Sequence, residues 1–212
     1  MMAALLPSSP PVWAFGGSRS LSAEASALAT SAARDLLRSE CRLVVGCCTG
    51  ADASALSAAV GLKLAERVSV FAAFGALGPV GHCPLGTCAV SAVVAVRAAV
   101  RAGATFQPWA GGSASVALSA RLSARTLAVA RACTAGAVVF LSPASRGALI
   151  LARAVAHRGL PVIAFPLLGA KLPVLASGCQ WSPAASTGFW SAGFIYLPNN
   201  PAQHSLPGLH LP

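Results

Sequence analysis

Short apolar runs alternate along the chain with longer segments whose apolar positions recur every three or four residues. Runs bounded by glycine or proline are typical of buried strands, and the longer periodic segments are typical of amphipathic helices. Strands are expected at 12–15, 42–46, 68–74, 105–107, 138–141, 161–165 and, at an edge, 194–197. Helices are expected at 22–39, 52–66, 89–102, 114–135 and 147–158.

This alternation of strand and helix predicts an α/β fold. We expect a Rossmann-like three-layer sandwich, in which a mostly parallel sheet is covered by helices on both faces. Residues 1–11 are expected to form a flexible leader, 12–166 the Rossmann domain, and 167–212 an irregular C-terminal extension rich in proline and glycine. The glycine- and proline-rich segment 75–88 is expected to be a loop.

Three turns rich in small and basic residues follow predicted strands, at 16–20, 46–50 and 142–147. Ligands of open α/β sheets bind beyond the carboxyl ends of the strands, where these turns fall. A turn that leads into a helix leaves backbone N–H groups free and places the positive end of the helix dipole in front of the strand. The pattern therefore predicts a site for a phosphate-bearing ligand.

Individual residues in and near these turns allow more than one role. The segment from Gly46 to Asp52 has neither the Gly-Lys-Ser/Thr end of a Walker A loop nor a GxGxxG pattern. Asp52 is most simply expected to cap its helix through its own side chain, and its other use is to accept a ribose hydroxyl. Arg121 and Arg125 point the same way on one helix, and form either a phosphate clamp or a solvated helix face.

The distribution of charged residues limits the kinds of catalysis and of binding partner that we expect. The chain has 15 Lys and Arg residues against five Asp and Glu, a net charge of +10, and all five acidic residues lie at or before Glu66. Catalysis by paired carboxylates is therefore excluded from 67–212. A basic balance suits anionic partners such as nucleotides, nucleic acid or a phospholipid surface, although a general bias towards alanine and arginine explains it equally well.

Mean hydropathy of +0.71 raises the question of a membrane protein. The charge-free stretches 68–96 and 172–212 are interrupted by glycine and proline, so we expect no membrane-spanning helix and no membrane partner. A signal peptide is not expected either, because the N-terminus lacks a basic region before its apolar run, and a cytoplasmic location follows.

The spacing of the cysteines matches no standard metal-binding pattern, and we expect no metal and no other cofactor. None of the seven cysteines forms a CxxC pair, and most are expected to be buried in a reducing compartment. His82, Cys83 and Cys88 lie close in the sequence, but nothing supplies the third group that orients a Cys–His nucleophile, so they are expected to be loop residues.

The turns also carry a family resemblance. The run Ala14-Phe15-Gly16-Gly17-Ser18-Arg19 is similar to the GSR turn after the first strand of the SLOG superfamily of Rossmann-type domains. The run from Val44 through Gly50-Ala51-Asp52 is similar to that family's second glycine turn. Over about 12–166 the chain thus resembles this family, which includes the Lonely Guy (LOG) cytokinin-activating proteins and the nucleotide-binding core of DNA-processing protein A.

The resemblance implies a nucleotide or nucleotide-derived ligand at the carboxyl edge of the sheet. It implies that Ser18 and Arg19 meet phosphate, that glycines in the second turn permit close approach, and that Ser145 and Gly147 complete the pocket. The expected ligand-binding residues are Gly16, Gly17, Ser18, Arg19, Gly46, Thr49, Gly50, Asp52, Arg121, Arg125, Ser142, Ser145, Arg146 and Gly147.

The chain departs from the LOG enzymes at one point. Their PGGxGT…E signature corresponds here to the run Pro143-Ala144-Ser145-Arg146-Gly147-Ala148, and the helix behind it has no Glu. We therefore expect a nucleotide-binding sensor or scaffold with little or no catalysis. The alternatives are a single-stranded DNA-binding protein like DNA-processing protein A, and a nucleotide N-glycosidic hydrolase that uses Asp52. A homodimer formed through the alanine-rich helices is a further expectation.

Overall fold

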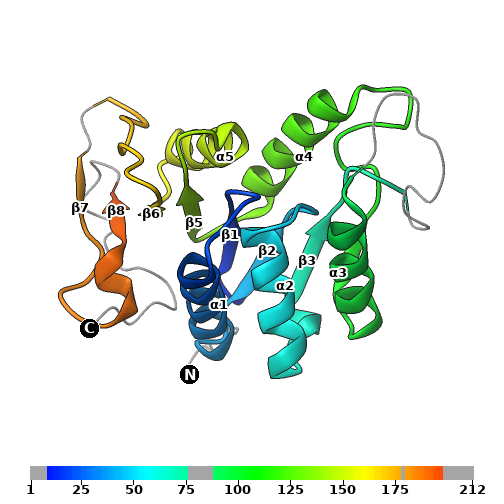
Figure 1. Ribbon diagram of the computed structural model, residues 1–212, viewed down its shortest axis with the longest axis horizontal. Coiled ribbons are helices and arrows are strands. Elements are labelled where there is room, and N and C mark those ends of the chain that lie inside the picture. The colour runs from blue at the N-terminus through cyan, green and yellow to red at the C-terminus, as the bar shows by residue number, and fades with distance from the viewer. Residues whose placement is uncertain (1–8, 76–87, 178–179, 198–212) are drawn as a thin grey trace, which may run out of the picture.

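The computed structural model describes residues 9–75, 88–177 and 180–197 (Figure 1). Two sequence expectations fall mainly outside these ranges, the leader at 1–11 and the loop at 75–88, and so does the end of the expected C-terminal extension, 198–212. The candidate loop residues His82 and Cys83 also lie outside them.

One sheet of eight strands runs through the described residues, in the order β4-β3-β2-β1-β5-β6-β8-β7. The first six strands are parallel to one another, whereas β8 pairs antiparallel with β6 and β7 pairs antiparallel with β8. The expected mostly parallel sheet is therefore confirmed. The strands are β1 (Val12–Gly17), β2 (Arg42–Val45), β3 (Val68–Phe71), β4 (Thr105–Gln107), β5 (Gly136–Leu141), β6 (Val162–Pro166), β7 (Trp181–Pro183) and β8 (Phe194–Tyr196).

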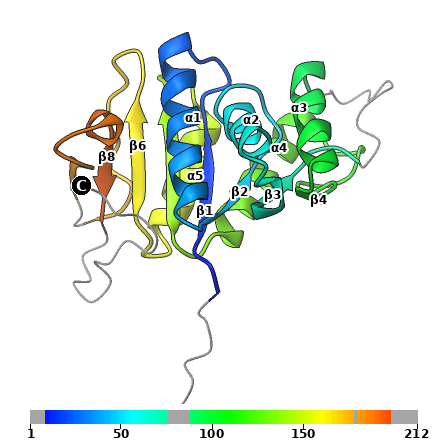
Figure 2. The ribbon, with the colours of Figure 1, turned by 90° about the horizontal axis from the view of Figure 1, so that it is seen from below.

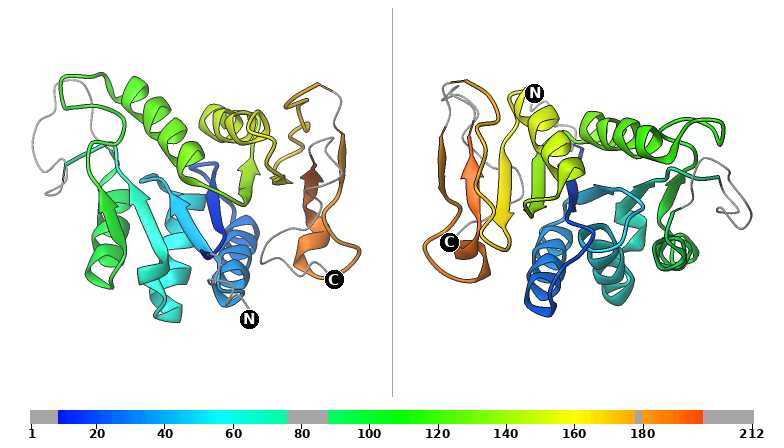
Figure 3. Two further views of the ribbon diagram at one scale, coloured as in Figure 1. Left: turned by 180° about the vertical axis from the view of Figure 1, so that it is seen from behind. Right: turned by 45° about the horizontal axis from the view of Figure 1, so that its top comes forward.

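Helices cover both faces of this sheet, as the alternating pattern predicts (Figures 2 and 3). Helices α1, α2 and α3 lie on one face, and α4 and α5 lie on the other. The helices of the described residues are α1 (Ala23–Arg38), α2 (Ala51–Leu62), α3 (Val90–Arg101), α4 (Leu118–Ala132) and α5 (Arg146–Ala156), with short 3-10 turns η1 (Ala65–Arg67) and η2 (Phe189–Ala192). None of these helices is long and apolar enough to cross a bilayer.

The central strand β5 shows how the sequence produces the two-sided core. All of its residues are buried, because side chains alternate between two covered faces. Val138 and Phe140 pack into the core under α1 and α2, whereas Val139 and Leu141 pack into the core under α4 and α5. A short run of consecutive apolar residues is what such a strand requires.

Four element boundaries differ from the expected ones by three or four residues. Helix α2 ends at Leu62 rather than 66, because Lys63 has a left-handed conformation with a φ of 58°, and helix α4 ends at Ala132 rather than 135. Strand β3 ends at Phe71, although the buried apolar run continues to Phe74. Helix α4 begins at Leu118 rather than 114, because Gly112 has a positive φ of 111° and residues 113–117 form turns before the helix. All four boundaries therefore lie inside the expected elements.

The sheet extends beyond Pro166, where the pattern placed the end of the domain. The expected strand at 194–197 is present as β8, but it lies inside the sheet between β6 and β7. The edge is formed by β7, a strand that was not expected. Trp190 ties this part of the chain to α1, because its indole N–H donates to Asp35 Oδ2 at 3.0 Å and its ring packs against Phe165. Residues 181–196 are thus part of the same sheet and core.

Candidate functional site

A cavity of about 870 Å³ opens where β1 and β5 end, between α4 and the first turn of α5. It lies at the carboxyl edge of the parallel strands. Most of the expected ligand-binding residues line it: Gly16, Gly17, Ser18, Arg19, Asp52, Arg125, Ser142, Ser145, Arg146 and Gly147. Gly46, Thr49, Gly50 and Arg121 lie outside its lining.

A network of hydroxyl groups joins the turns after β1 and β5 at the rim of this cavity. The backbone N–H of Ser18 donates to Phe140 O at 2.8 Å, which fixes the first turn against β5. The Ser142 hydroxyl donates to Ser18 Oγ at 3.3 Å, and the Ser142 and Ser145 hydroxyls lie 2.6 Å apart. Two turns distant in the sequence therefore present one polar surface.

Helix α5 directs its N-terminus at the same rim. Ser145 occupies the N-cap position, but its side chain makes no capping hydrogen bond, since its oxygen accepts the N–H of Ser142 at 3.0 Å instead. The N–H of Arg146 donates to Ala144 O at 2.9 Å, so the N–H groups of Gly147 and Ala148 and the positive end of the helix dipole are available to an anion. A Cβ added to Gly147 would meet nothing within 4 Å, so the approach to this backbone is open.

The charges around the cavity favour an anion at its rim. Arg19 and Arg146 are exposed, one on each of the two turns. Because every residue after Glu66 is free of side-chain carboxylates, the walls formed by α4 and α5 carry no negative side chain. Among the described residues that line the cavity, Asp52 is the one carboxylate.

The turn after β2 (46–50) packs against the turn after β1 (16–20) and holds its backbone in place. The Thr49 hydroxyl donates to Arg19 O at 3.0 Å, and the N–H of Ala51 donates to Ser18 O at 3.1 Å. Gly50 has a φ of 71°, and a Cβ there would lie 2.1 Å from Ser18 O. Thr49 and Gly50 therefore hold the shape of the Ser18–Arg19 turn, and only glycine permits this close packing.

The expectation that Asp52 caps its own helix is wrong. Gly50 is the N-cap residue of α2, and no side chain caps that helix. The carboxylate of Asp52 is turned back towards the preceding loop, where Oδ2 accepts the N–H of Cys48 at 3.0 Å and pairs with Arg125 Nη1 at 3.4 Å. The residue thus joins α2 to α4 instead of satisfying the start of α2.

Arg121 and Arg125 form neither a solvated face nor a paired clamp, since their side chains take different surroundings. Both are buried, with 1% and 6% of their surfaces exposed. Arg121 Nη1 donates to Ala73 O at 2.7 Å, and its guanidinium carbon lies 5.5 Å from the centre of the Trp109 ring. Arg121 therefore stabilises the fold away from the cavity, and Arg125 alone lines it.

Arg125 is accommodated by a glycine. A Cβ added to Gly46 would lie 1.4 Å from Arg125 Nη1, so the missing side chain makes room for the guanidinium. Arg125 Nη2 also donates to Cys48 Sγ at 3.1 Å. The guanidinium thus bridges the turn after β2 and the first turn of α2.

Burial and mutual attraction together shift the pKa values of Asp52 and Arg125. Burial raises the pKa of Asp52, against the opposing effects of Arg125 and the Cys48 N–H. Burial also disfavours charge on Arg125, but the neighbouring Asp52 carboxylate and the thiols of Cys47 and Cys48 outweigh it and raise the pKa of Arg125. The guanidinium is therefore charged at any physiological pH.

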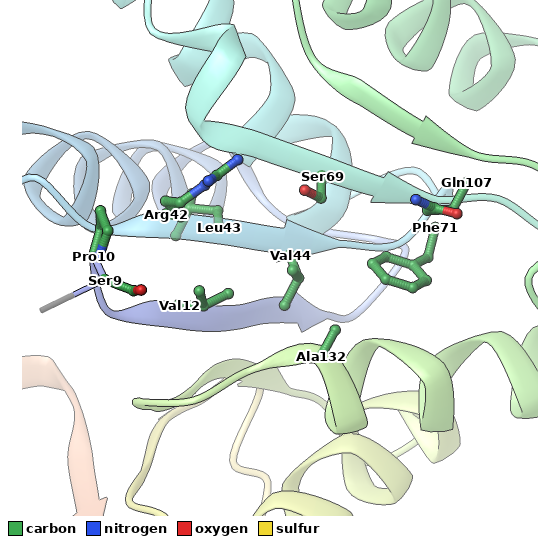
Figure 4. A pocket seen from close by; sticks show the side chains of 10 residues that line it. All are labelled: Ser9, Pro10, Val12, Arg42, Leu43, Val44, Ser69, Phe71, Gln107 and Ala132. Carbon is green, nitrogen blue, oxygen red and sulfur yellow. The ribbon is translucent and has the colours of Figure 1, made fainter.

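A second cavity, of about 250 Å³, lies over β1, β2 and β3 near the end of α4 (Figure 4). Val44 and Phe71 point from the sheet towards Ala132, and Arg42 is the one charged residue of the lining. Among the residues that line this cavity there is no helix N-terminus and no cation besides Arg42, so it is much less suited to an anion than the larger cavity. Within the described ranges, no group of three His, Cys, Asp or Glu side chains is placed to hold a metal ion.

Part of the larger cavity was not expected from the sequence. Its apolar wall includes Leu118 and Leu122 from α4, Ile150 from α5, and Leu168 from the segment after β6. The spacing of Leu118 and Leu122 places both on the apolar side of α4, but periodicity does not distinguish a core position from a pocket wall. Leu168 is 84% exposed and follows the last parallel strand, where no pattern marks it.

Comparison with known proteins supports the fold. No protein-family model matches the chain, and no curated protein matches it. The crystal structure of DNA processing protein A (DprA) from Streptococcus pneumoniae is similar, with a TM-score of 0.53 and 21% sequence identity. The match covers 76% of this chain and 52% of that chain, so this chain spans about half of the DprA structure. The two chains share an α/β fold of the same kind.

Proposed function

We propose that this chain binds a nucleotide or nucleotide-derived ligand at the carboxyl edge of its sheet and acts as a sensor or scaffold. The observation that carries this proposal is the convergence of two serine- and arginine-containing turns with an uncapped helix N-terminus on one cavity. This combination of donors is what a phosphate group requires.

In this proposal the phosphate of the ligand lies at the rim of the cavity. Arg19 and Arg146 would approach it from opposite turns, while the first-turn amides of α5 and the rim hydroxyls donate hydrogen bonds. Arginine suits this role because its planar donors match phosphate oxygens. The α4 and α5 walls carry no carboxylate, so no negative side chain on these helices weakens the attraction of Arg19 and Arg146 for the phosphate.

The remainder of the cavity suits a nucleoside. Its volume lies within the range of small-molecule sites, and the four apolar side chains from α4, α5 and the segment after β6 provide a wall for a planar base. A binding role is favoured over hydrolysis, because Asp52 is the one carboxylate among the described lining residues and acid–base catalysis of glycosidic bonds ordinarily uses two.

Calorimetric titration with AMP tests the proposal, with inorganic phosphate as a competitor. Arg19→Gln and Arg146→Gln each remove one rim cation while keeping a polar side chain. Each is expected to weaken AMP binding by roughly 5- to 10-fold, since a charge-assisted hydrogen bond at an exposed site is worth about 1 kcal/mol or slightly more.

Arg34→Gln is the matched control, because Arg34 is an exposed arginine on α1, outside the cavity. Its affinity for AMP should equal that of the unchanged protein. Equal losses in all three variants, or the absence of AMP and phosphate binding at millimolar concentration, would contradict the proposal. Mass spectrometry of small molecules released by denaturing the purified protein would then identify the natural ligand.

Single-stranded DNA is the second candidate ligand. It is favoured by the structural likeness to DNA processing protein A together with the net charge of +10. Both features suit a phosphate backbone, and the same rim would take one of its phosphates.

The salt dependence of binding separates the two candidates. Contacts with several phosphates release several counterions, so DNA affinity would fall steeply between 50 and 200 mM salt. Fluorescence anisotropy with a labelled oligothymidylate measures this slope. A steep slope that Arg19→Gln and Arg146→Gln reduce would favour DNA, whereas undetectable or salt-independent binding would exclude it.

A further inference from the structure

One carboxylate oxygen at the floor of the cavity receives no hydrogen bond from the described residues. Asp52 is 4% exposed and lines the cavity. Its Oδ2 is occupied by the Cys48 N–H and by Arg125, whereas Oδ1 accepts no hydrogen bond from any residue of the described ranges. A Cβ on Gly16 would lie 3.2 Å from Oδ1, which places this oxygen beside the end of β1, directly before the Ser18–Arg19 turn.

The partner of Asp52 is also incompletely satisfied. In the described part of the chain, Nε of Arg125 is buried and has no hydrogen-bond acceptor, and the ion pair itself is long at 3.4 Å. Buried polar atoms in folded proteins almost always have partners, and an unpaired one destabilises the fold. Nε of Arg125 is itself closed off from the cavity, so the group that the floor presents to a bound molecule is the acceptor Oδ1 of Asp52.

The chemistry of Oδ1 limits what that molecule presents there. A carboxylate repels phosphate, so the phosphate belongs at the cationic rim and a neutral donor belongs at the floor. The apolar wall is suited to a base, and Gly16 stands only two residues before Ser18, which borders the phosphate position. In a nucleoside 5′-phosphate, the groups that lie one sugar ring away from the phosphate are the ribose hydroxyls.

We propose that Asp52 is a specificity-determining residue that accepts a hydrogen bond from a ribose hydroxyl, so that the site selects ribonucleotides over deoxynucleotides. The proposal rests on the proposed nucleotide-binding function. Arg125 is a positioning residue in this arrangement, because it holds Oδ2 and thereby directs Oδ1 into the cavity.

Affinities of the unchanged protein for AMP, 2′-deoxy-AMP and 3′-deoxy-AMP test the proposal without any substitution. We expect one of the deoxy compounds to bind roughly 10- to 100-fold more weakly than AMP, which is the range for a lost hydrogen bond to a charged group. Asp52→Asn should reduce this ratio severalfold, while inorganic phosphate still competes with AMP.

Asp35→Asn is the matched control, because Asp35 lies on α1 outside the cavity and an amide oxygen can still accept the Trp190 N–H. It should retain the full preference for AMP. Equal affinity for all three nucleotides in the unchanged protein would overturn the inference and leave the proposed function standing. A preference that Asp52→Asn leaves intact would also overturn it. Failure of AMP and phosphate to bind at all would overturn both.

Discussion

Nη1 of Arg125 lies 3.4 Å from Oδ2 of Asp52, and this contact joins two helices that pack on opposite faces of the sheet. Arg125 belongs to α4 and Asp52 to α2, and the guanidinium passes over Gly46 at the end of β2. The floor of the candidate site is therefore built from both helical layers, and a change in this pair affects the fold and the site together.

Removing Arg125 alone should be strongly destabilising. Arg125→Met leaves the Asp52 carboxylate buried without its cation, and breaking a buried pair in this way costs about 3–5 kcal/mol of unfolding free energy. The double variant Asp52→Asn/Arg125→Met should lose less than the sum of the two single variants, because it leaves no unpaired charge. Urea denaturation measures all three.

Arg131→Met provides the control for this cycle, because Arg131 is exposed on the same helix. Its unfolding free energy should change by no more than about 0.5 kcal/mol. Strict additivity of the two single substitutions would show that the pair is not coupled, contrary to the geometry.

Gly46→Ala should destabilise the protein through the same contact. The new methyl group would occupy the position of the Arg125 guanidinium, and overpacking of this kind costs roughly 1–3 kcal/mol. Gly61→Ala is the matched substitution, since Gly61 lies in α2 with nothing within 4 Å of the added Cβ. It should stabilise the protein by about 0.5–1 kcal/mol. Similar thermal unfolding midpoints for the two variants would refute this account of Gly46.

The parallel arrangement of β1 to β6 could be predicted from the sequence, because each buried strand is a short apolar run and each of the first five runs is followed by a periodic helix. The spatial order of these strands does not follow from that pattern. The position of the site could be predicted for a related reason. Parallel strands place their carboxyl ends at one edge, so the turns after β1 and β5 had to fall on the same side of the sheet. That they meet there depends on the pairing of β1 with β5, which the sequence pattern does not give.

The roles of individual residues depend on neighbours that the local sequence does not reveal. Gly46 reads as a small turn residue, and only the structure shows that Arg125 fills the space beside it. The burial of Arg121 depends on an acceptor at Ala73, on a different element. Strand β7 was missed because Trp181–Pro183 is short and contains proline, so no periodic pattern distinguishes it from a loop.

Trp190→Phe should show that the C-terminal strands are part of the domain. Phenylalanine keeps the aromatic contact with Phe165 but leaves Asp35 Oδ2 without its indole donor. The loss of this hydrogen bond should lower the unfolding free energy by about 1–3 kcal/mol. Equilibrium denaturation monitored by circular dichroism measures the change, and an unaltered midpoint would mean that this contact contributes nothing.

The cysteines should differ in reactivity. A hydrogen bond from Cys47 lowers the pKa of the half-buried Cys88, whereas burial raises the pKa of Cys41 to about 11. Because the thiolate is the reactive form, iodoacetamide at pH 8 should modify Cys88 well before Cys41 in the folded protein. Modification of Cys41 should accelerate as the pH rises towards 11. Peptide mass spectrometry over a time course gives both rates, and equal rates at pH 8 would contradict the assignment.

A crystal structure determined with AMP at saturating concentration is the decisive experiment for the proposed site. We expect the phosphate between the Ser18–Arg19 turn and the first turn of α5, with the base against Leu118 and Leu122. AMP bound instead in the smaller cavity over β2 and β3, or an empty larger cavity under these conditions, would contradict it.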